Sequence, residues 1–161
     1  MNNALSSVRF LSSVNSEELA CHVFGSRERY LHLSKLWKLV EDDPSFSKVG
    51  RNNKNHVQRY TDACRKIQRY KEVLDEARLS RGQQLTLDDM YDLYIAIDEN
   101  LPIDVHLSMF IPLMMYHTSS DQKKRWLDDA MNLRIIGAYA QTELAHGSNV
   151  RGIETEAVYD T

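Results

Sequence analysis

The sequence predicts a mainly α-helical protein in which residues 132–161 begin a β-domain. Apolar residues recur at three- and four-residue steps from about residue 16 to residue 131, and few breakers interrupt them. After Asn132 the apolar residues alternate instead. With 42% hydrophobic and 27% charged residues among 161, the composition is that of a folded globular protein and excludes a disordered chain. We therefore expect an N-terminal helical domain over residues 1–131 and the first strands of an incomplete β-domain over residues 132–161.

The first two helices have recognisable starts and faces. Ser16 precedes Glu17 and Glu18, and acidic residues in a first turn interact favourably with the helix dipole. A second helix is expected over residues 27–41, where one face collects Tyr30, Leu33, Leu36, Trp37 and Val40. It ends before Pro44, and a loop rich in Ser, Gly and Asn follows over residues 44–55.

Four further helical segments are expected. A long amphipathic helix ends near Gly82 and carries Tyr60, Cys64, Ile67, Val73, Leu74 and Ala77 on its apolar face. Thr86, followed by Asp88 and Asp89, resembles the start of the next helix. Another helix follows Pro102 and is expected to kink at Pro112. Ser120 is expected to cap the last helix, which runs to Met131.

Two strands are expected after Asn132. The first would place Leu133, Ile135, Gly137 and Tyr139 on one face and Ile136, Ala138 and Ala140 on the other, which predicts a strand covered on both faces. The second alternates Ile153, Thr155, Ala157 and Tyr159 with Glu154, Glu156 and Asp160, which predicts one solvated face. Because the sequence stops at Thr161 within this strand, we expect an unpaired edge and an incomplete site.

The loop between these strands is the candidate binding segment. It offers the hydrogen-bonding side chains of Gln141, Thr142, Ser148 and Asn149. Gly147 would let backbone N–H groups approach an anion such as a phosphate or the edge of a flavin. As a pattern alone, such a loop is more often a purely structural turn.

Several function classes are disfavoured. The net charge is −3 and the basic residues are spread along the chain, so nucleic acid and anionic membranes are poor partners. No apolar run approaches the roughly 20 residues of a transmembrane helix. The two cysteines lie far apart and the histidines lack ligand spacing, so no metal site is expected. The Ser-rich residues 1–16 resemble a transit peptide only faintly, and a frayed terminus is expected there.

Residues 135–160 resemble a segment of the peroxisomal acyl-CoA oxidases. The family pattern is Ile-Gly-x-Tyr-Ala-Gln-Thr-Glu-(Leu/Met)-Gly-His-Gly-(Ser/Thr)-x-x-x-Gly-(Leu/Ile)-Glu-Thr, and the chain matches nearly every fixed position. Residues 103–112 are similar to the family's Asp-x-His-x-x-Met-Phe-x-Pro segment, and residues 15–25 and 41–46 resemble its early helices and its Asn-Asp-Pro-x-Phe turn more loosely.

The resemblance implies a flavin adenine dinucleotide (FAD) site. Thr142 matches a flavin ligand, Gln141 matches a residue whose backbone meets the isoalloxazine edge, and Gly147 and Ser148 match a pair beside the pyrophosphate. The implied reaction is α,β-dehydrogenation of a fatty acyl-CoA, in which oxygen then reoxidises the flavin and forms hydrogen peroxide. The family's glutamate base corresponds to a position beyond Thr161, so no catalytic residue is expected in this chain.

The resemblance also implies a peroxisomal location and a homodimer for the full-length protein, although the ending Tyr159-Asp160-Thr161 is no peroxisomal signal. One departure is Ala145, where the family usually has glycine; a positive φ there would strain the alanine by about 1 kcal/mol. Two alternatives stay open. One is an acyl-CoA dehydrogenase, although those enzymes usually carry Thr-Glu-Pro-x-x-Gly-Ser. The other is a non-catalytic helical module that binds a partner or modulates a dimer.

Overall fold

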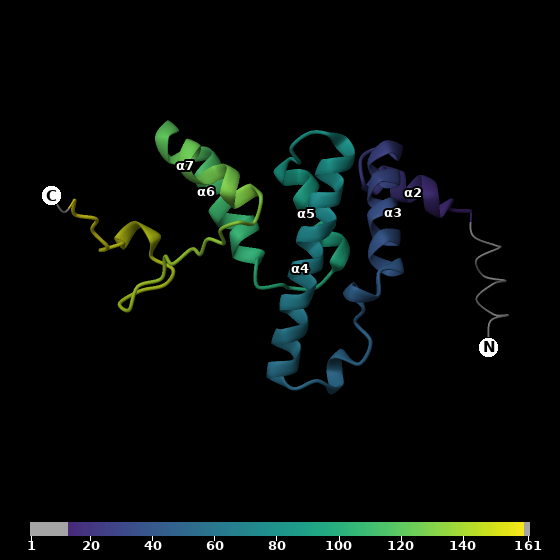
Figure 1. The fold of residues 1–161 in the computed structure, drawn as a ribbon, viewed down its shortest axis with the longest axis horizontal. Coiled ribbons are helices and arrows are strands. Elements are labelled where there is room, and N and C mark those ends of the chain that lie inside the picture. Colours follow the sequence, from purple (N-terminus) through teal and green to yellow (C-terminus); the bar gives the residue numbers. More distant parts are fainter. Residues whose placement is uncertain (1–12, 160–161) are drawn as a thin grey trace. The chain divides into compact units, whose positions relative to one another are not determined.

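The computed structural model describes residues 13–159 (Figure 1). Within it the chain forms two compact units that divide between Asn100 and Leu101. Most of the N-terminal segment for which fraying was predicted, and Asp160 of the second predicted strand, lie outside the described residues. The described residues are mainly helical, as predicted.

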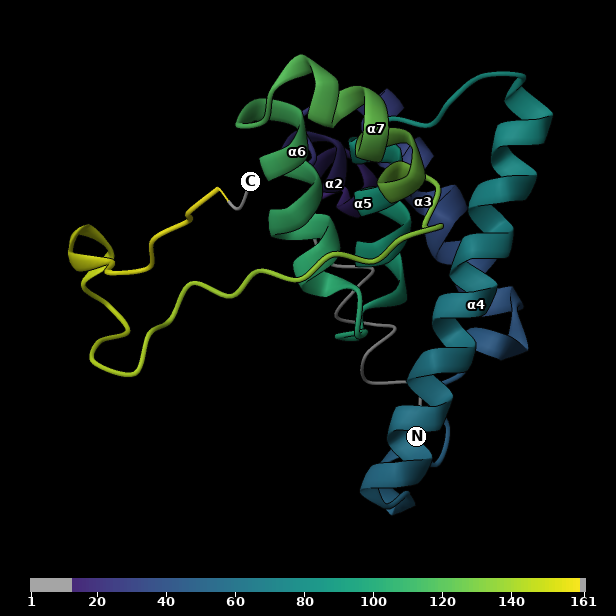
Figure 2. The same cartoon turned by 60° about the vertical axis from the view of Figure 1, so that its left-hand side comes forward.

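Within residues 13–100 the first unit contains four helices and two short 3₁₀ turns. The helices are α2 (Ser16–Val23), α3 (Arg27–Asp42), α4 (His56–Arg81) and α5 (Leu87–Ile97), and the turns are η1 (Pro44–Phe46) and η2 (Arg51–Asn53). Helix α3 contacts α2 and α5, while α4 contacts α5 and η1. Figure 2 shows the length of α4, which ends at Gly82 in the left-handed conformation as a C-cap.

Local side-chain chemistry sets the helix starts. Asn15 caps α2 by accepting hydrogen bonds from the N–H groups of Glu17 and Glu18 at 3.0 and 3.3 Å. The predicted start at Thr86 is confirmed, because Thr86 and Asp89 form a reciprocal capping box.

The cap predicted at Ser120 is wrong by one residue. Ser119 caps α7 (Ser120–Met131), because Gln122 lies three residues further on and returns the hydrogen bond to the backbone N–H of Ser119. Ser120 is followed at that spacing by Lys123, which has no acceptor to offer.

The core of the first unit lies between α3, α4 and α5. Its buried apolar side chains include Leu33, Phe46, Tyr70, Val73, Leu74, Met90, Leu93 and Ile97. A polar contact lies beside these apolar side chains. The buried carboxylate of Asp92 on α5 forms an ion pair with Arg29 and lies 3.1 Å from Nε2 of His32, and both partners belong to α3. A buried carboxylate needs such partners, so this contact orients α3 against α5.

The second unit contains a π-helical turn, η3 (His106–Phe110), followed by α6 (Ile111–Tyr116), α7 and the 3₁₀ turn η4 (Val150–Gly152). Pro112 lies in the first turn of α6 instead of kinking the interior of one helix. A proline is tolerated in the first turn of a helix, because the N–H groups of that turn have no acceptor within the helix. The buried apolar side chains of the second unit include Leu101, Ile103, Leu107, Ile111 and Met114.

The predicted strands differ most from the structure. Among residues 133–159 there is no strand, and the only β-pairing is an isolated antiparallel bridge between Glu143 and His146. A strand is defined by hydrogen bonds to a neighbouring strand, and the two segments do not pair with each other. Side chains expected to be covered are open instead, with Ile136 at 59% and Tyr159 at 88% exposure. Helix α7 does end at Met131, but the domain division predicted there stays a prediction.

Candidate functional site

The candidate loop begins where α7 ends. The N–H groups of Leu133 and Arg134 donate to the carbonyls of Ala130 and Asp129 at 3.0 and 2.9 Å, which is the bonding of a Schellman motif. Leu133 occupies the left-handed position, with φ of 51°, where glycine is usual. Its side chain is buried, and burial of a leucine contributes about 1.5–3 kcal/mol against a conformational cost of about 1 kcal/mol. This turn sets the direction in which the chain leaves the helix.

His106 then fixes the departing segment. Its Nδ1 accepts a hydrogen bond from the N–H of Gly137 at 2.9 Å, and its Nε2 lies 3.1 Å from the carbonyl oxygen of Ala130. Since a carbonyl only accepts, Nε2 carries the proton and the ring is neutral. His106 is 1% exposed, and burial lowers its pKa, which keeps Nδ1 free to accept.

Gly137 is required at this contact. A Cβ at this position would lie 2.1 Å from Cγ of Phe110, far inside van der Waals contact. The Phe110 ring also stacks on His106, with ring centroids 5.5 Å apart. The π turn therefore supplies both groups that hold the backbone at Gly137.

Glu143 closes the loop further along. Its carboxylate accepts hydrogen bonds from the backbone N–H of Glu154 at 2.9 Å and of Thr155 at 2.8 Å, and also from the Thr155 hydroxyl. The Thr155 hydroxyl first, and then the Glu154 N–H, lower the pKa of the Glu143 carboxyl. The two ends of the segment 143–155 are thus tied together by one ionised side chain.

His146 lies beside the same carboxylate. Its Nε2 is 3.1 Å from Glu143 Oε2, although without the angle that a hydrogen bond needs. The backbones of the two residues exchange hydrogen bonds of 3.2 and 3.3 Å. The carboxylate beside His146 is thus the glutamate of the same Thr-Glu motif.

The predicted cofactor-binding residues flank Glu143 and His146 in the sequence of this loop. Thr142, Gly147 and Ser148 are exposed and Gln141 is half-buried. Their backbone N–H groups and the side chains of Gln141, Thr142 and Ser148 donate no hydrogen bond to any residue in the range 13–159. Such unsatisfied donors close together in a loop are suited to an anionic or flavin ligand.

The two small residues of the loop have ordinary backbone conformations. Within residues 13–159 the non-glycine positions with positive φ are Asp98 and Leu133, so Ala145 is not strained. A Cβ on Gly147 would meet Thr142 Cγ2 at 3.7 Å, an ordinary contact, and its φ is not left-handed. The conformational need for glycine that the sequence suggested at these positions is absent, whereas Gly137 has a steric need that was not foreseen.

Other site types find no support. Within the described range no three His, Cys, Asp or Glu side chains are grouped so that they could hold a metal ion. None of the helices in residues 13–159 has both the length and the apolar character that a membrane crossing requires.

Comparison with known proteins identifies the family. The family model described as acyl-coenzyme A oxidase N-terminal matches residues 15–136. The chain belongs to the acyl-CoA oxidase family. This acyl-CoA oxidase chain is 35% identical over 136 residues to peroxisomal acyl-coenzyme A oxidase 1 of Arabidopsis thaliana, covering 84% of the chain and 20% of that protein. It is 32% identical over 160 residues to the Homo sapiens protein of the same name, covering 99% of the chain and 24% of that protein.

Solved structures give the same result. The acyl-CoA oxidase of tomato, Lycopersicon esculentum, superposes with a TM-score of 0.86 at 34% identity, over 97% of this chain and 23% of that one. Acyl-CoA oxidase-2 of Caenorhabditis elegans, solved with FAD, ascaroside-CoA and ATP, superposes with a TM-score of 0.82 at 28% identity, over 99% of this chain and 24% of that one. The acyl-CoA oxidase chain described here therefore spans about a quarter of the length of its relatives.

Proposed function

We propose that this chain is the N-terminal part of a flavin-dependent acyl-CoA oxidase and supplies one edge of its FAD site. The observation that carries the proposal is that the donors of Gln141, Thr142, Gly147 and Ser148 make no hydrogen bond to any other residue in the range 13–159. These positions match the family segment that contacts the flavin, and one structural relative was solved with FAD bound.

Each loop residue has a distinct proposed role. Thr142 holds the flavin ring together with the backbone of Gln141, while Gly147 and Ser148 donate backbone N–H groups to the pyrophosphate. When bound, FAD would accept the hydride of acyl-CoA dehydrogenation, and N–H donors at the ring edge would stabilise the negative charge that develops there. Glu143 keeps the loop closed, and His106 holds the segment that leads into it.

The remaining parts of the enzyme are also proposals. The substrate is a fatty acyl-CoA, the product is a trans-2-enoyl-CoA, and oxygen is reduced to hydrogen peroxide during fatty acid β-oxidation in the peroxisome. The catalytic base belongs to a region outside this chain, so residues 1–161 alone do not catalyse. In the complete homodimeric enzyme, residues 133–140 and 153–159 would pair as strands of the middle β-domain, which would cover the exposed Ile136 and Tyr159.

A chimeric enzyme tests this proposal. Residues 1–161 replace the matching segment of Arabidopsis acyl-coenzyme A oxidase 1, and bound flavin and acyl-CoA-dependent peroxide are measured. We expect a yellow protein that forms peroxide, and Thr142→Val should lower its flavin content while Thr61→Val, on the exposed face of α4, leaves it unchanged.

Three outcomes would contradict the proposal. A folded but colourless chimera would favour a non-catalytic helical module. A yellow chimera that reduces an electron-transferring flavoprotein acceptor without forming peroxide would favour an acyl-CoA dehydrogenase. Equal flavin content in the Thr142→Val and Thr61→Val variants would remove Thr142 from the site.

A further inference from the structure

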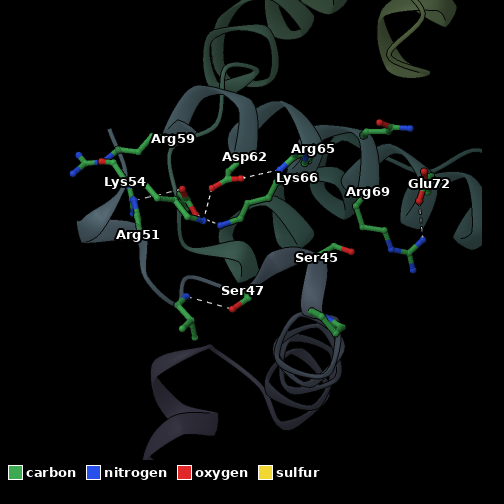
Figure 3. Close-up of a pocket in the computed structure, with 14 residues that line it drawn as sticks. Ser45, Ser47, Arg51, Lys54, Arg59, Asp62, Arg65, Lys66, Arg69 and Glu72 are labelled. Atoms are coloured by element: carbon green, nitrogen blue, oxygen red, sulfur yellow. Dashed lines mark hydrogen bonds and ion pairs between the residues drawn. The ribbon is translucent and has the colours of Figure 1, made fainter. Parts of the chain in front are cut away.

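A polar cavity of about 410 Å³ lies in the first unit, between residues 44–54 and the first half of α4 (Figure 3). This volume is within the range of small-molecule sites. Its charged lining consists of Arg51, Lys54, Arg59, Arg65, Lys66, Arg69, Asp62, Glu72 and Glu99. None of the proposed flavin-binding residues lines this cavity.

The sequence brings these groups together by simple spacing. Arg59, Asp62, Lys66 and Arg69 follow one another at steps of three and four residues, which places them along one face of α4. Turn η2 and the residue after it add Arg51 and Lys54.

Positive charge is in excess at the η2 end of the cavity. Asp62 is shared by Lys54 and Arg65, the latter at 3.3 Å. Glu99 is shared by Lys66 and Arg51, the latter at 3.5 Å. Two carboxylates therefore serve four cations.

Arg59 adds a fifth cation at this end. No carboxylate of residues 13–159 lies within ion-pair distance of its guanidinium, and its Nε donates instead to the carbonyl of Lys54 at 3.0 Å. Five cations against two carboxylates leave an excess of three positive charges.

The opposite end of the cavity has the reverse balance. Arg69 meets three carboxylates, Asp43 at 2.7 Å, Glu72 at 3.1 Å and Glu76 at 3.0 Å. In Figure 3 Arg69 and Glu72 lie on the right of the view, and Arg51 and Lys54 lie on the left. The positive charge is therefore local to one end, although the whole chain has a net charge of −3.

Lys66 shows that this end is a formed site and not only a basic surface. It is 5% exposed, and among the described residues its ammonium donates to Glu99 alone. An ammonium has three N–H donors, and a buried one needs acceptors for them. Figure 3 shows the Lys66 and Asp62 side chains pointing into the same space.

We propose that the cationic end of this cavity binds a polyphosphate chain. Guanidinium groups match phosphate oxygens in a bidentate manner, and ammonium groups pair with them as point charges. An excess of three positive charges suits two or three linked phosphates better than a single carboxylate. Ser47 adds a neutral donor, because its Oγ accepts from the N–H of Val49 at 3.3 Å and keeps its own proton available.

Calorimetric titration of the chain with inorganic tripolyphosphate tests this assignment. We expect saturable binding of one tripolyphosphate, weakened by added salt. The double variant R51Q/R59Q removes two exposed cations and should weaken binding at least tenfold, because each lost guanidinium is a charged partner of the phosphates, although solvent screens it in part. The variant D62N should tighten binding, because it frees Lys54 and Arg65.

The matched control is K35Q/K38Q, which removes the same charge from exposed positions on α3 outside the cavity. It should change the affinity less than twofold. An equal loss in both double variants, or no saturable binding by a chain whose circular dichroism is native, would overturn the proposal. D62N offers a second route to rejection, because unchanged or weaker binding would contradict the charge argument without requiring R51Q/R59Q to fold.

Competition identifies where the phosphates come from. Displacement of tripolyphosphate by a nucleoside triphosphate supports a free nucleotide as the ligand, and displacement by coenzyme A supports the carrier of the thioester. Failure of both to displace it would contradict a physiological phosphate site.

Discussion

Gly137→Ala tests the contact of Gly137 with Phe110 and His106, by which the π turn η3 fixes the segment that leads into the candidate loop. The new Cβ would lie 2.1–2.3 Å from three atoms of the Phe110 ring. The nearest of them is Cγ, which does not move when the ring turns about χ2. Either Phe110 must change its χ1 rotamer or the backbone at 137 must move away, and movement would stretch the 2.9 Å hydrogen bond to His106.

The cost of the substitution combines three effects. Overpacking costs about 1–3 kcal/mol, and loss of the hydrogen bond costs about 0.5–1.5 kcal/mol. Replacement of glycine by alanine returns about 0.4–1 kcal/mol, because the unfolded chain becomes less flexible. We therefore expect a net destabilisation of about 2 kcal/mol.

Urea unfolding measures this cost in the second unit. The chain has two tryptophans, Trp37 in the first unit and Trp126 in the second, so a Trp37→Phe background lets fluorescence report on Trp126 alone. Gly147→Ala is the matched control, because its Cβ meets an ordinary contact, and we expect a change within about 0.5 kcal/mol.

A double-mutant cycle with Phe110→Ala isolates the steric contact. In that background Gly137→Ala should cost less than about 0.5 kcal/mol, since the clashing ring is gone. The reasoning is refuted if Gly137→Ala is as mild as Gly147→Ala, or if its cost is unchanged without the Phe110 ring.

Three further predictions concern named hydrogen bonds. Burial lowers the pKa of His106 in the folded chain. Its contribution to stability is therefore complete above the unfolded pKa of about 6.5 and declines as the pH falls toward the folded pKa. The free energy of unfolding, followed by Trp126 fluorescence, should fall from pH 7.5 to pH 5.5. Glu143→Gln should lower the protection of the Glu154 amide, measured as its exchange rate relative to the intrinsic rate at the same pH, and acidification through the lowered pKa of Glu143 should lower that protection in the wild type. Tyr70→Phe removes a buried hydrogen bond of 2.8 Å to the Met90 carbonyl and should cost about 0.5–1.5 kcal/mol of unfolding free energy.

Each of these predictions has its own control. Replacement of His106 by Gln should remove most of the pH dependence, and an unchanged profile would contradict the assignment of the neutral ring. Exchange at the Leu107 amide, inside the π turn, should not respond to Glu143→Gln. Tyr60 is 59% exposed, and Tyr60→Phe should leave stability unchanged; equal effects at Tyr60 and Tyr70 would deny the buried bond.

Local sequence signals determined most of the helical part. The apolar steps over residues 27–41 predict α3, and the Thr86–Asp89 spacing predicts the start of α5, because side-chain periodicity and capping act within a few residues. The glutamine three residues after Ser119 was the signal missed at α7. The motif residues Gln141, Thr142, Gly147 and Ser148 could be singled out from sequence because the family pattern is nearly intact.

Tertiary structure decided what depends on groups far apart in the chain. The alternation after Asn132 predicted strands, yet a strand needs hydrogen bonds from another strand, and residues 133–159 contain no such pair. His106 and Gly137 are 31 positions apart, and no local pattern indicates that the His106 ring accepts a hydrogen bond from the Gly137 N–H. The shared carboxylates Asp62 and Glu99 likewise acquire their meaning from packing, because the excess of positive charge exists only once η2, α4 and the end of α5 meet.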